Sequence, residues 1–148
     1  MVRIGQAIML HRGGDREEAR NRFGLLWKET EQTGHLFHRC AIAHYMAEAQ
    51  DDPVDGLEWD LRALAAADAL TEEWTRWGEH ARAVRSLYPS LYLSLASDHA
   101  RLGDRTAARH ELGRARGLLG ELGDDAYSGR IRAAVARLEE RLQDGRPA

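Results

Sequence analysis

The chain has 148 residues, of which 43% are apolar and 30% charged, and its formal net charge is −3. This length suits one domain with an ordinary core, and the composition excludes both a disordered chain and a membrane protein. No apolar run approaches the roughly 18 residues that span a bilayer, and no basic face is available for a phosphate backbone. Neither a membrane nor a nucleic acid is therefore an expected partner.

The cysteine content and the N-terminal segment indicate a compartment. Cys40 is the single cysteine, which excludes an internal disulfide framework and fits a reducing environment. The first ten residues carry one charged side chain, Arg3, and a short apolar patch, so we expect no secretory leader. Together these features predict a cytoplasmic protein.

The sequence predicts an all-α fold, because helix formers dominate and no strand-like alternation of β-branched or aromatic residues occurs. Gly-Gly, Gly-Asp and Asp-Pro pairs mark the ends of the segments. The predicted helices span residues 2–12, 15–34, 35–50, 53–70, 71–88, the two arms of 89–120, and 125–143.

Apolar spacing indicates which face of each helix is buried. In the helix at 53–70, Leu57, Leu61 and Leu64 form the expected stripe. A new helix is expected to begin at Thr71, because a Thr followed by two glutamates is typical of a helix start. This helix carries Trp74 and Trp77, which are interpreted either as core residues or as a possible interface with a partner.

Residues 89–120 contain the clearest motif of the chain. Two helices are joined at Gly103-Asp104, and large and small residues alternate as in a packed helical hairpin. The pattern consists of Tyr92, Leu95, Ala96, His99, Ala108, Leu112, Ala115 and Gly120. With these residues the segment resembles the tetratricopeptide repeat (TPR), a helical pair of about 34 residues, although His99 replaces a Tyr and Gly120 replaces a Pro.

Two weaker copies of this pattern precede it. At identical offsets the N-terminus has Ala7, Leu10, Gly14, Ala19 and Phe23. The middle has Ala43, Met46, Gly56 and Ala63, with a turn that is one residue longer. The segments HRCAIAHYMAEAQDDP and YPSLYLSLA are similar to those of small stand-alone TPR proteins from high-GC bacteria.

This resemblance implies a single domain, 1–148, built as a right-handed all-α helical-repeat stack. Its helix pairs would span about 1–34, 35–70 and 89–122, with an inserted helix at 71–88 and a C-terminal capping helix at 124–143. The function implied is a non-enzymatic scaffold or regulator that binds a protein, a peptide or its own dimer mate on the concave face.

The resemblance also implies where the ligand binds, because the first helix of each TPR pair lines the concave face. Carried over to this sequence, the positions are Ile8, His11, Arg12, Phe37, Cys40, His44, Glu48, Leu93, Ser97 and Arg101. We expect a ligand- or peptide-binding groove at these residues, with no cofactor.

One stripe of this groove leaves an alternative open. Cys40, His44 and Glu48 are spaced four residues apart, so they share one helix face. Thiolate, imidazole and carboxylate can all ligate zinc, which would suit a metal-dependent or small-molecule enzyme. A buried thiol beside an ordinary His–Glu helix contact explains the same spacing. Nearby, His35, His38 and Arg39 are interpreted as solvated residues at a helix start.

Overall fold

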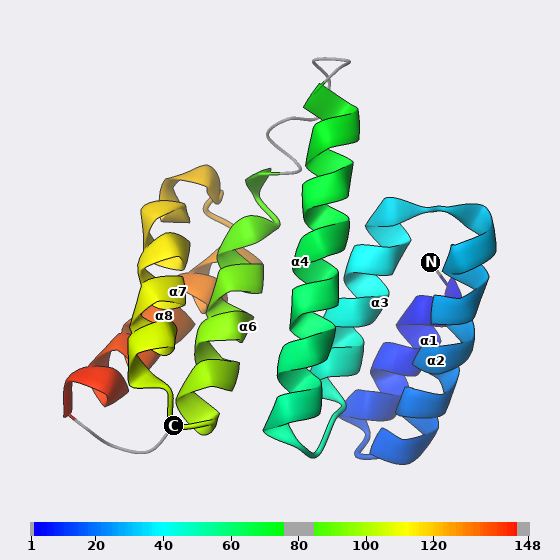
Figure 1. Cartoon of the computed structure of the whole chain (residues 1–148), viewed down its shortest axis with the longest axis horizontal. Helices are drawn as coiled ribbons and strands as arrows, with labels where there is room; N and C mark the ends of the chain where they lie inside the picture. Colours follow the sequence, from blue (N-terminus) through cyan, green and yellow to red (C-terminus); the bar gives the residue numbers. More distant parts are fainter. Residues whose placement is uncertain (1, 76–84, 145–148) are drawn as a thin grey trace. The chain divides into compact units, whose positions relative to one another are not determined.

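The computed structural model describes residues 2–75 and 85–144. These residues form helices and no strand, which confirms the predicted all-α class. The contacts divide the chain into two compact units, unit 1 (Met1–Glu73) and unit 2 (Trp74–Ala148). The helices of both are labelled in Figure 1.

Unit 1 contains α1 (Val2–Arg12), α2 (Arg16–Thr33), α3 (Leu36–Glu48) and the greater part of α4 (Pro53–Thr75). The helix α2 packs against both α1 and α3 (Figure 1). Its apolar face carries the buried residues Ala19, Phe23 and Leu26, and Phe23 is fully buried. The core cluster joins the three helices through Ile4, Ala7, Ala19, Phe23, Leu26, Ile42 and Met46.

Unit 2 contains α6 (Tyr88–Arg101), α7 (Arg105–Gly117), a short 3-10 helix η1 (Leu119–Glu121) and α8 (Ala126–Asp144). The helix α8 packs against both α6 and α7 through its buried residues Val135, Leu138 and Leu142. The C-terminal end of α8 is held because Arg105 and Arg109 both donate hydrogen bonds to the carbonyl oxygen of Leu142. Cationic groups at a helix C-terminus satisfy carbonyl groups that lack an intrahelical partner.

The turns of the α1–α2 and α6–α7 hairpins have the same backbone structure. Gly14 has φ 89° and Gly103 has φ 81°, a backbone region in which residues other than Gly are strained. Each glycine precedes an aspartate whose carboxylate accepts a hydrogen bond from the amide three residues later: Asp15 from Glu18, and Asp104 from Ala107. The backbone bonds around the turns match as well. The sequence places Gly14 and Gly103 at corresponding positions of the two hairpins, and the turns at these positions do have matching structures.

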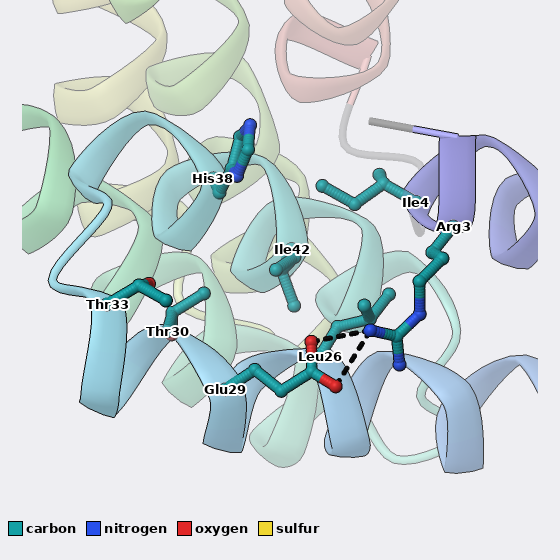
Figure 2. A pocket seen from close by; sticks show the side chains of 8 residues that line it. All are labelled: Arg3, Ile4, Leu26, Glu29, Thr30, Thr33, His38 and Ile42. Carbon is teal, nitrogen blue, oxygen red and sulfur yellow. Dashed lines mark hydrogen bonds and ion pairs between the residues drawn. The ribbon is translucent and has the colours of Figure 1, made fainter.

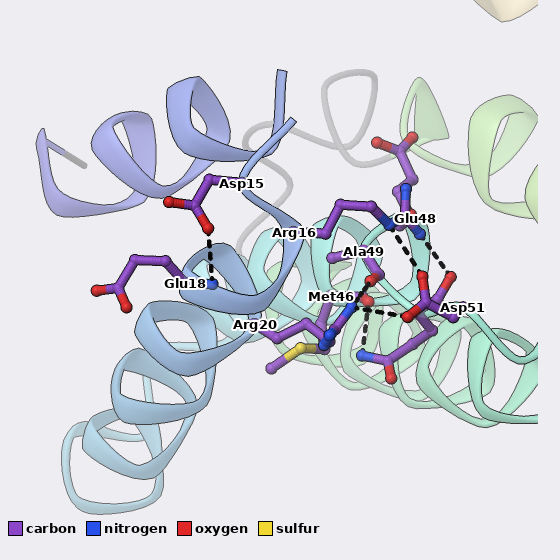
Figure 3. A network of polar contacts seen from close by, with 9 residues as sticks. Asp15, Arg16, Glu18, Arg20, Met46, Glu48, Ala49 and Asp51 are labelled. Atoms are coloured by element: carbon purple, nitrogen blue, oxygen red, sulfur yellow. Dashed lines mark hydrogen bonds and ion pairs between the residues drawn. The ribbon is translucent and has the colours of Figure 1, made fainter. Parts of the chain in front are cut away.

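The end of α3 is tied to the start of α2 by two arginines (Figure 3). Arg16 donates to the carbonyl oxygens of Glu48 (3.2 Å) and Gln50 (2.7 Å), and Arg20 donates to that of Ala49 (2.8 Å). Both guanidinium groups also pair with Asp51. These bonds satisfy the last carbonyl groups of α3 and fix the turn into α4.

Aromatic and cationic side chains join α2, α3 and α4 at another point. The rings of Trp27 (α2) and Trp59 (α4) meet edge to face, with centroids 5.1 Å apart. The guanidinium group of Arg39 lies 3.9 Å from the centre of the Trp27 ring, and that of Arg62 lies 4.3 Å from the centre of the Trp59 ring. Such stacking adds attraction beyond the burial of apolar area.

Two predictions about α4 are wrong. The helix continues through Thr71, whose hydroxyl donates to the carbonyl oxygen of Ala67 (2.9 Å), as Thr does inside a helix. The buried face is also not the leucine stripe, since Leu61 is exposed and Leu57 and Leu64 are only half-buried, whereas Asp60 is buried. The remainder of the helix expected at 71–88 lies mostly outside the described residues.

Candidate functional site

The predicted stripe on α3 passes from the interior to the surface. Cys40 is buried, with 4% of its surface exposed. The side chain of His44 is 19% exposed and that of Glu48 is 49% exposed. The shared helix face was therefore predicted correctly, but only the outer end of the stripe can meet a ligand. The thiol of Cys40 does not reach a groove surface.

A second carboxylate, that of Asp60 on α4, lies close to His44. Nδ1 of His44 lies 3.6 Å from Oδ1 of Asp60, whose side chain is only 4% exposed. Nε2 of His44 lies 3.6 Å from Oε1 of Glu48. The imidazole ring is thus placed between a buried and a solvated carboxylate. We call these residues the His44 cluster: Cys40, His44, Glu48 and Asp60.

The chemistry of Cys40 is that of an unreactive thiol. Burial, and secondly the nearby Asp60 carboxylate, raise the pKa of Cys40 to about 11. At neutral pH the side chain is protonated, whereas nucleophilic attack and metal ligation need the thiolate. Within the described part of the chain, no three His, Cys, Asp or Glu side chains are arranged to hold a metal ion.

A pocket opens on a different side of α3, where α1, α2 and α3 meet (Figure 2). Its volume is about 340 Å³. The apolar part of its lining consists of Ile4, Leu26 and Ile42, which are all buried core residues. The polar part consists of Arg3, Glu29, Thr30, Thr33 and His38. We call this cavity the unit 1 pocket.

The polar groups of the unit 1 pocket largely satisfy one another. Nη1 of Arg3 donates to both carboxylate oxygens of Glu29, at 2.8 and 2.7 Å, on one side of the pocket (Figure 2). The hydroxyl of Thr30 donates to the carbonyl oxygen of Trp27 and accepts a hydrogen bond from Arg39 (3.0 Å). The lining therefore carries one positive and one negative charge that are already paired.

His38 contributes an uncharged ring to this lining at neutral pH. It stacks on His35, with ring centroids 3.7 Å apart, and His35 also accepts the hydrogen bond from the backbone amide of His38. Burial, followed by the repulsion of His35, lowers the pKa of His38 below 6.5. The interpretation of His35, His38 and Arg39 as solvated residues holds for His35, which is exposed at the start of α3, whereas His38 and Arg39 are half-buried.

The other predicted groove residues of unit 1 have different surroundings. Phe37 is exposed, and its ring centroid lies 6.4 Å from that of His38, but it is not one of the residues that line the unit 1 pocket. Arg12 is exposed at the end of α1. His11 is half-buried, and its Nδ1 has no hydrogen-bond partner among the residues described. Ile8 packs against the core cluster.

The predicted residues of unit 2 lie on α6. Leu93 and Ser97 are half-buried, and Arg101 is exposed at the end of the helix. A hollow of about 210 Å³ lies between α7 and α8, but its arginines are already bound. Arg109 donates to the carbonyl oxygen of Leu142, and Arg116 pairs with Glu139 at 2.6 Å. Two proposed interface residues cannot be placed. Trp77 and the side chain of Trp74 lie outside the described part of the chain.

The site residues that the sequence did not predict come from contacts between helices. Asp60 has no signal of its own, because a carboxylate among leucines looks like a solvated residue. Arg3, Glu29 and Thr30 gain their roles only when α1 and α2 lie side by side. The two histidines at the start of α3 were the one signal that pointed to the pocket.

No protein-family model, curated protein or solved structure matches the chain. No helix in the described part of the chain is both long and apolar enough to cross a bilayer. The unit 1 pocket and the His44 cluster are therefore the two candidate functional sites.

Proposed function

We propose that this protein is a non-enzymatic binding module, a scaffold or regulator that holds a peptide segment of a partner protein. One observation carries the proposal: the unit 1 pocket is open, has an apolar floor and is bordered by hydrogen-bonding side chains. Its volume of about 340 Å³ is at the small end of ligand sites and suits one side chain better than a whole cofactor.

The proposal includes the arrangement of the helices. In it, α1–α2, α3–α4 and α6–α7 are TPR-like pairs of one right-handed stack, and α8 is the cap. The matching turns at Gly14-Asp15 and Gly103-Asp104 support this idea. The fully buried alanines at corresponding positions, Ala19 and Ala108, support it as well.

Within unit 1 the peptide would continue from the pocket along the first helices of the pairs, α1 and α3. Phe37 and Arg12 are exposed enough to contact it, and so is the outer carboxylate of Glu48. His44 and Cys40 would serve mainly to hold α3 against α4, because their surfaces are largely covered.

The alternative, an enzyme built around Cys40, His44 and Glu48, has less physical support. Its nucleophile or metal ligand would be a buried thiol with a pKa of about 11. The imidazole of His44 lies between two carboxylates, at 3.6 Å each, and only 19% of its side chain is exposed. The unit 1 pocket is lined by other residues, so these groups do not face it.

The binding proposal can be tested with a random dodecapeptide display library panned against the full chain. Enriched peptides are synthesised, and their affinities are measured by calorimetry. Thr33 lines the pocket and is exposed, so Thr33→Trp should narrow the pocket without disturbing the core. We expect this substitution to weaken the peptides about tenfold or more.

The matched control is Thr106→Trp, the same change at an exposed threonine on α7 of unit 2. It should leave the affinity unchanged. The proposal fails if no peptide is enriched, or if the enriched peptides bind the Thr33→Trp variant as tightly as the wild type. Sedimentation of the wild type at high micromolar concentration shows whether a second copy of the chain is the partner.

A further inference from the structure

We propose that the unit 1 pocket takes a single uncharged aromatic side chain, so that the partner's peptide is anchored by a phenylalanine, tyrosine or tryptophan. This inference rests on the proposed binding function and adds the class of residue that is recognised. Three properties of the pocket support it: its size, its balance of charge and the nature of its walls.

The size fits one or two fused rings. A buried apolar cavity of about 150 Å³ is enough to enclose benzene. The unit 1 pocket, at about 340 Å³, has roughly twice that volume. A small aliphatic side chain would leave part of the space empty and lose the dispersion contacts that a ring makes with Ile4, Leu26 and Ile42.

The charge balance disfavours an ionised anchor. Nη1 of Arg3 already donates to both carboxylate oxygens of Glu29, so a ligand of either sign would have to compete with a bound counter-charge. Burial and the repulsion of His35 lower the pKa of His38, which disfavours a positive charge on this ring. An ionised side chain would therefore lose its hydration against the apolar floor without gaining an unpaired counter-charge.

The walls favour a ring over a flexible chain. The imidazole of His38 lies at the pocket, backed by the stacked ring of His35, so one wall is a rigid aromatic surface. Aromatic rings pair favourably with such a surface in offset or edge-to-face geometry. The hydroxyl of Thr30 already donates one hydrogen bond and accepts another, so it does not need a polar group of the ligand as a partner.

The test uses side-chain analogues as probes on the full chain. Isoleucine methyl groups are well suited as reporters, because the chain has only four isoleucines: Ile4, Ile8, Ile42 and Ile131. We expect p-cresol and 3-methylindole to shift the methyl NMR signals of Ile4 and Ile42 in a saturable way. The signal of Ile131, which lies in unit 2, should stay in place. An Ile42→Val variant assigns the Ile42 signal.

Charged and aliphatic probes supply the contrast. We expect 4-methylbenzoate, 4-methylbenzylammonium and isoamyl alcohol to bind roughly tenfold more weakly than p-cresol. Arg3→Ala should then improve binding of the ammonium probe, because it frees the carboxylate of Glu29. Glu29→Gln should improve binding of the benzoate probe, because it frees the guanidinium of Arg3. Both positions are exposed, so the fold should persist.

The results separate this inference from the proposed function. If p-cresol leaves the Ile4 and Ile42 signals unmoved, or if a charged or aliphatic probe binds equally well, the aromatic anchor is refuted even when library peptides bind. If p-cresol binds as expected and the enriched peptides lack an aromatic residue, the anchor is again refuted. If p-cresol binds but no peptide is enriched, the peptide-binding function fails and the specificity of the pocket stands.

Discussion

Replacing His44 should expose the energetic role of the His44 cluster. Asp60 is buried, and its Oδ1 lies 3.6 Å from Nδ1 of His44. Removing one partner of a buried pair typically costs about 3–5 kcal/mol, because the other charge stays buried. Here the separation exceeds a hydrogen bond and the ring reaches solvent. We therefore expect His44→Ala to lower the free energy of unfolding by about 2–3 kcal/mol.

The change at the other partner should cost less. Asp60→Asn removes the buried charge but keeps the shape of the side chain, so we expect a loss of about 1 kcal/mol. In the double variant His44→Ala/Asp60→Asn, no buried carboxylate faces the missing ring. Its loss should therefore be smaller than the sum of the two single losses by about 1–2 kcal/mol. Glu48→Gln is the matched control, and this solvated partner should contribute under about 0.5 kcal/mol.

Cys40 itself provides the assay. It is the only cysteine of the chain, it is buried, and it lies one turn from His44 on α3. Pulsed thiol labelling along a urea series, read by mass spectrometry, therefore reports the unfolding of unit 1 alone. The free energy follows from linear extrapolation. The reasoning is refuted if His44→Ala costs no more than Glu48→Gln, or if the two single losses simply add.

Three further predictions concern single residues. Because the pKa of Cys40 is about 11 against an ordinary 9.0, iodoacetamide at pH 8 should alkylate the folded chain at least roughly 100-fold more slowly than the urea-unfolded chain; equal rates would contradict the burial of the thiol. Gly103→Ala should destabilise unit 2 by about 1–2 kcal/mol because φ is 81° there, whereas Gly113→Ala, inside α7 with open space around its Cβ, should stabilise it by up to about 1 kcal/mol; thermal melts that shift in the same direction would speak against this account. The pKa of His38 is lowered in the folded state, so the unfolded chain binds more protons below pH 6.5. The free energy of unfolding should therefore decrease as the pH is lowered from 6.5 through the pKa of the folded state. His38→Gln should flatten this pH dependence of the urea midpoint, and an unchanged pH profile would argue against it.

The features that the sequence predicted well are those whose chemistry lies within a few residues. A Gly followed by Asp is enough to end one helix and cap the next, and both Gly14-Asp15 and Gly103-Asp104 do so. The same holds for the last helix, where Asp125 accepts a hydrogen bond from the amide of Ser128. Such local interactions need no partner helix, so the neighbouring residues alone predict them.

Thr71 shows where a local signal is ambiguous. A Thr followed by two glutamates can cap a new helix, or it can continue an existing one by bonding back to the previous turn. The structure has the second outcome, since the hydroxyl of Thr71 donates to Ala67. The alanine-rich segment at 63–70 has a high helix propensity and gives the helix no reason to stop. The helix propensity of the residues before Thr71 therefore decides the boundary, and the cap pattern does not include those residues.

The contacts between helices were the part that could not be predicted. Asp60 pairs with His44 only because α4 turns its small residues inward, and the leucine spacing favoured a neighbouring face that is only half-buried at Leu57 and Leu64. The pair of Arg3 and Glu29 likewise depends on the register between α1 and α2. Long side chains can reach several neighbours, and the register of two packed helices is a property of the whole core.

The stripe of Cys40, His44 and Glu48 shows why a shared helix face does not define a site. Periodicity places the three side chains in one row along α3. Their exposure increases along the helix from Cys40 to Glu48, so that each side chain has a different environment. The thiol is kept protonated, the imidazole is enclosed by carboxylates, and the outer carboxylate is solvated. Combined chemistry requires groups that face a common space. On α3 that space is reached from His38 and Ile42, which line the unit 1 pocket together with residues of α1 and α2. A binding function that depends on this pocket should therefore survive Cys40→Ala and fail with Thr33→Trp, which is the opposite of what a site built on the stripe requires.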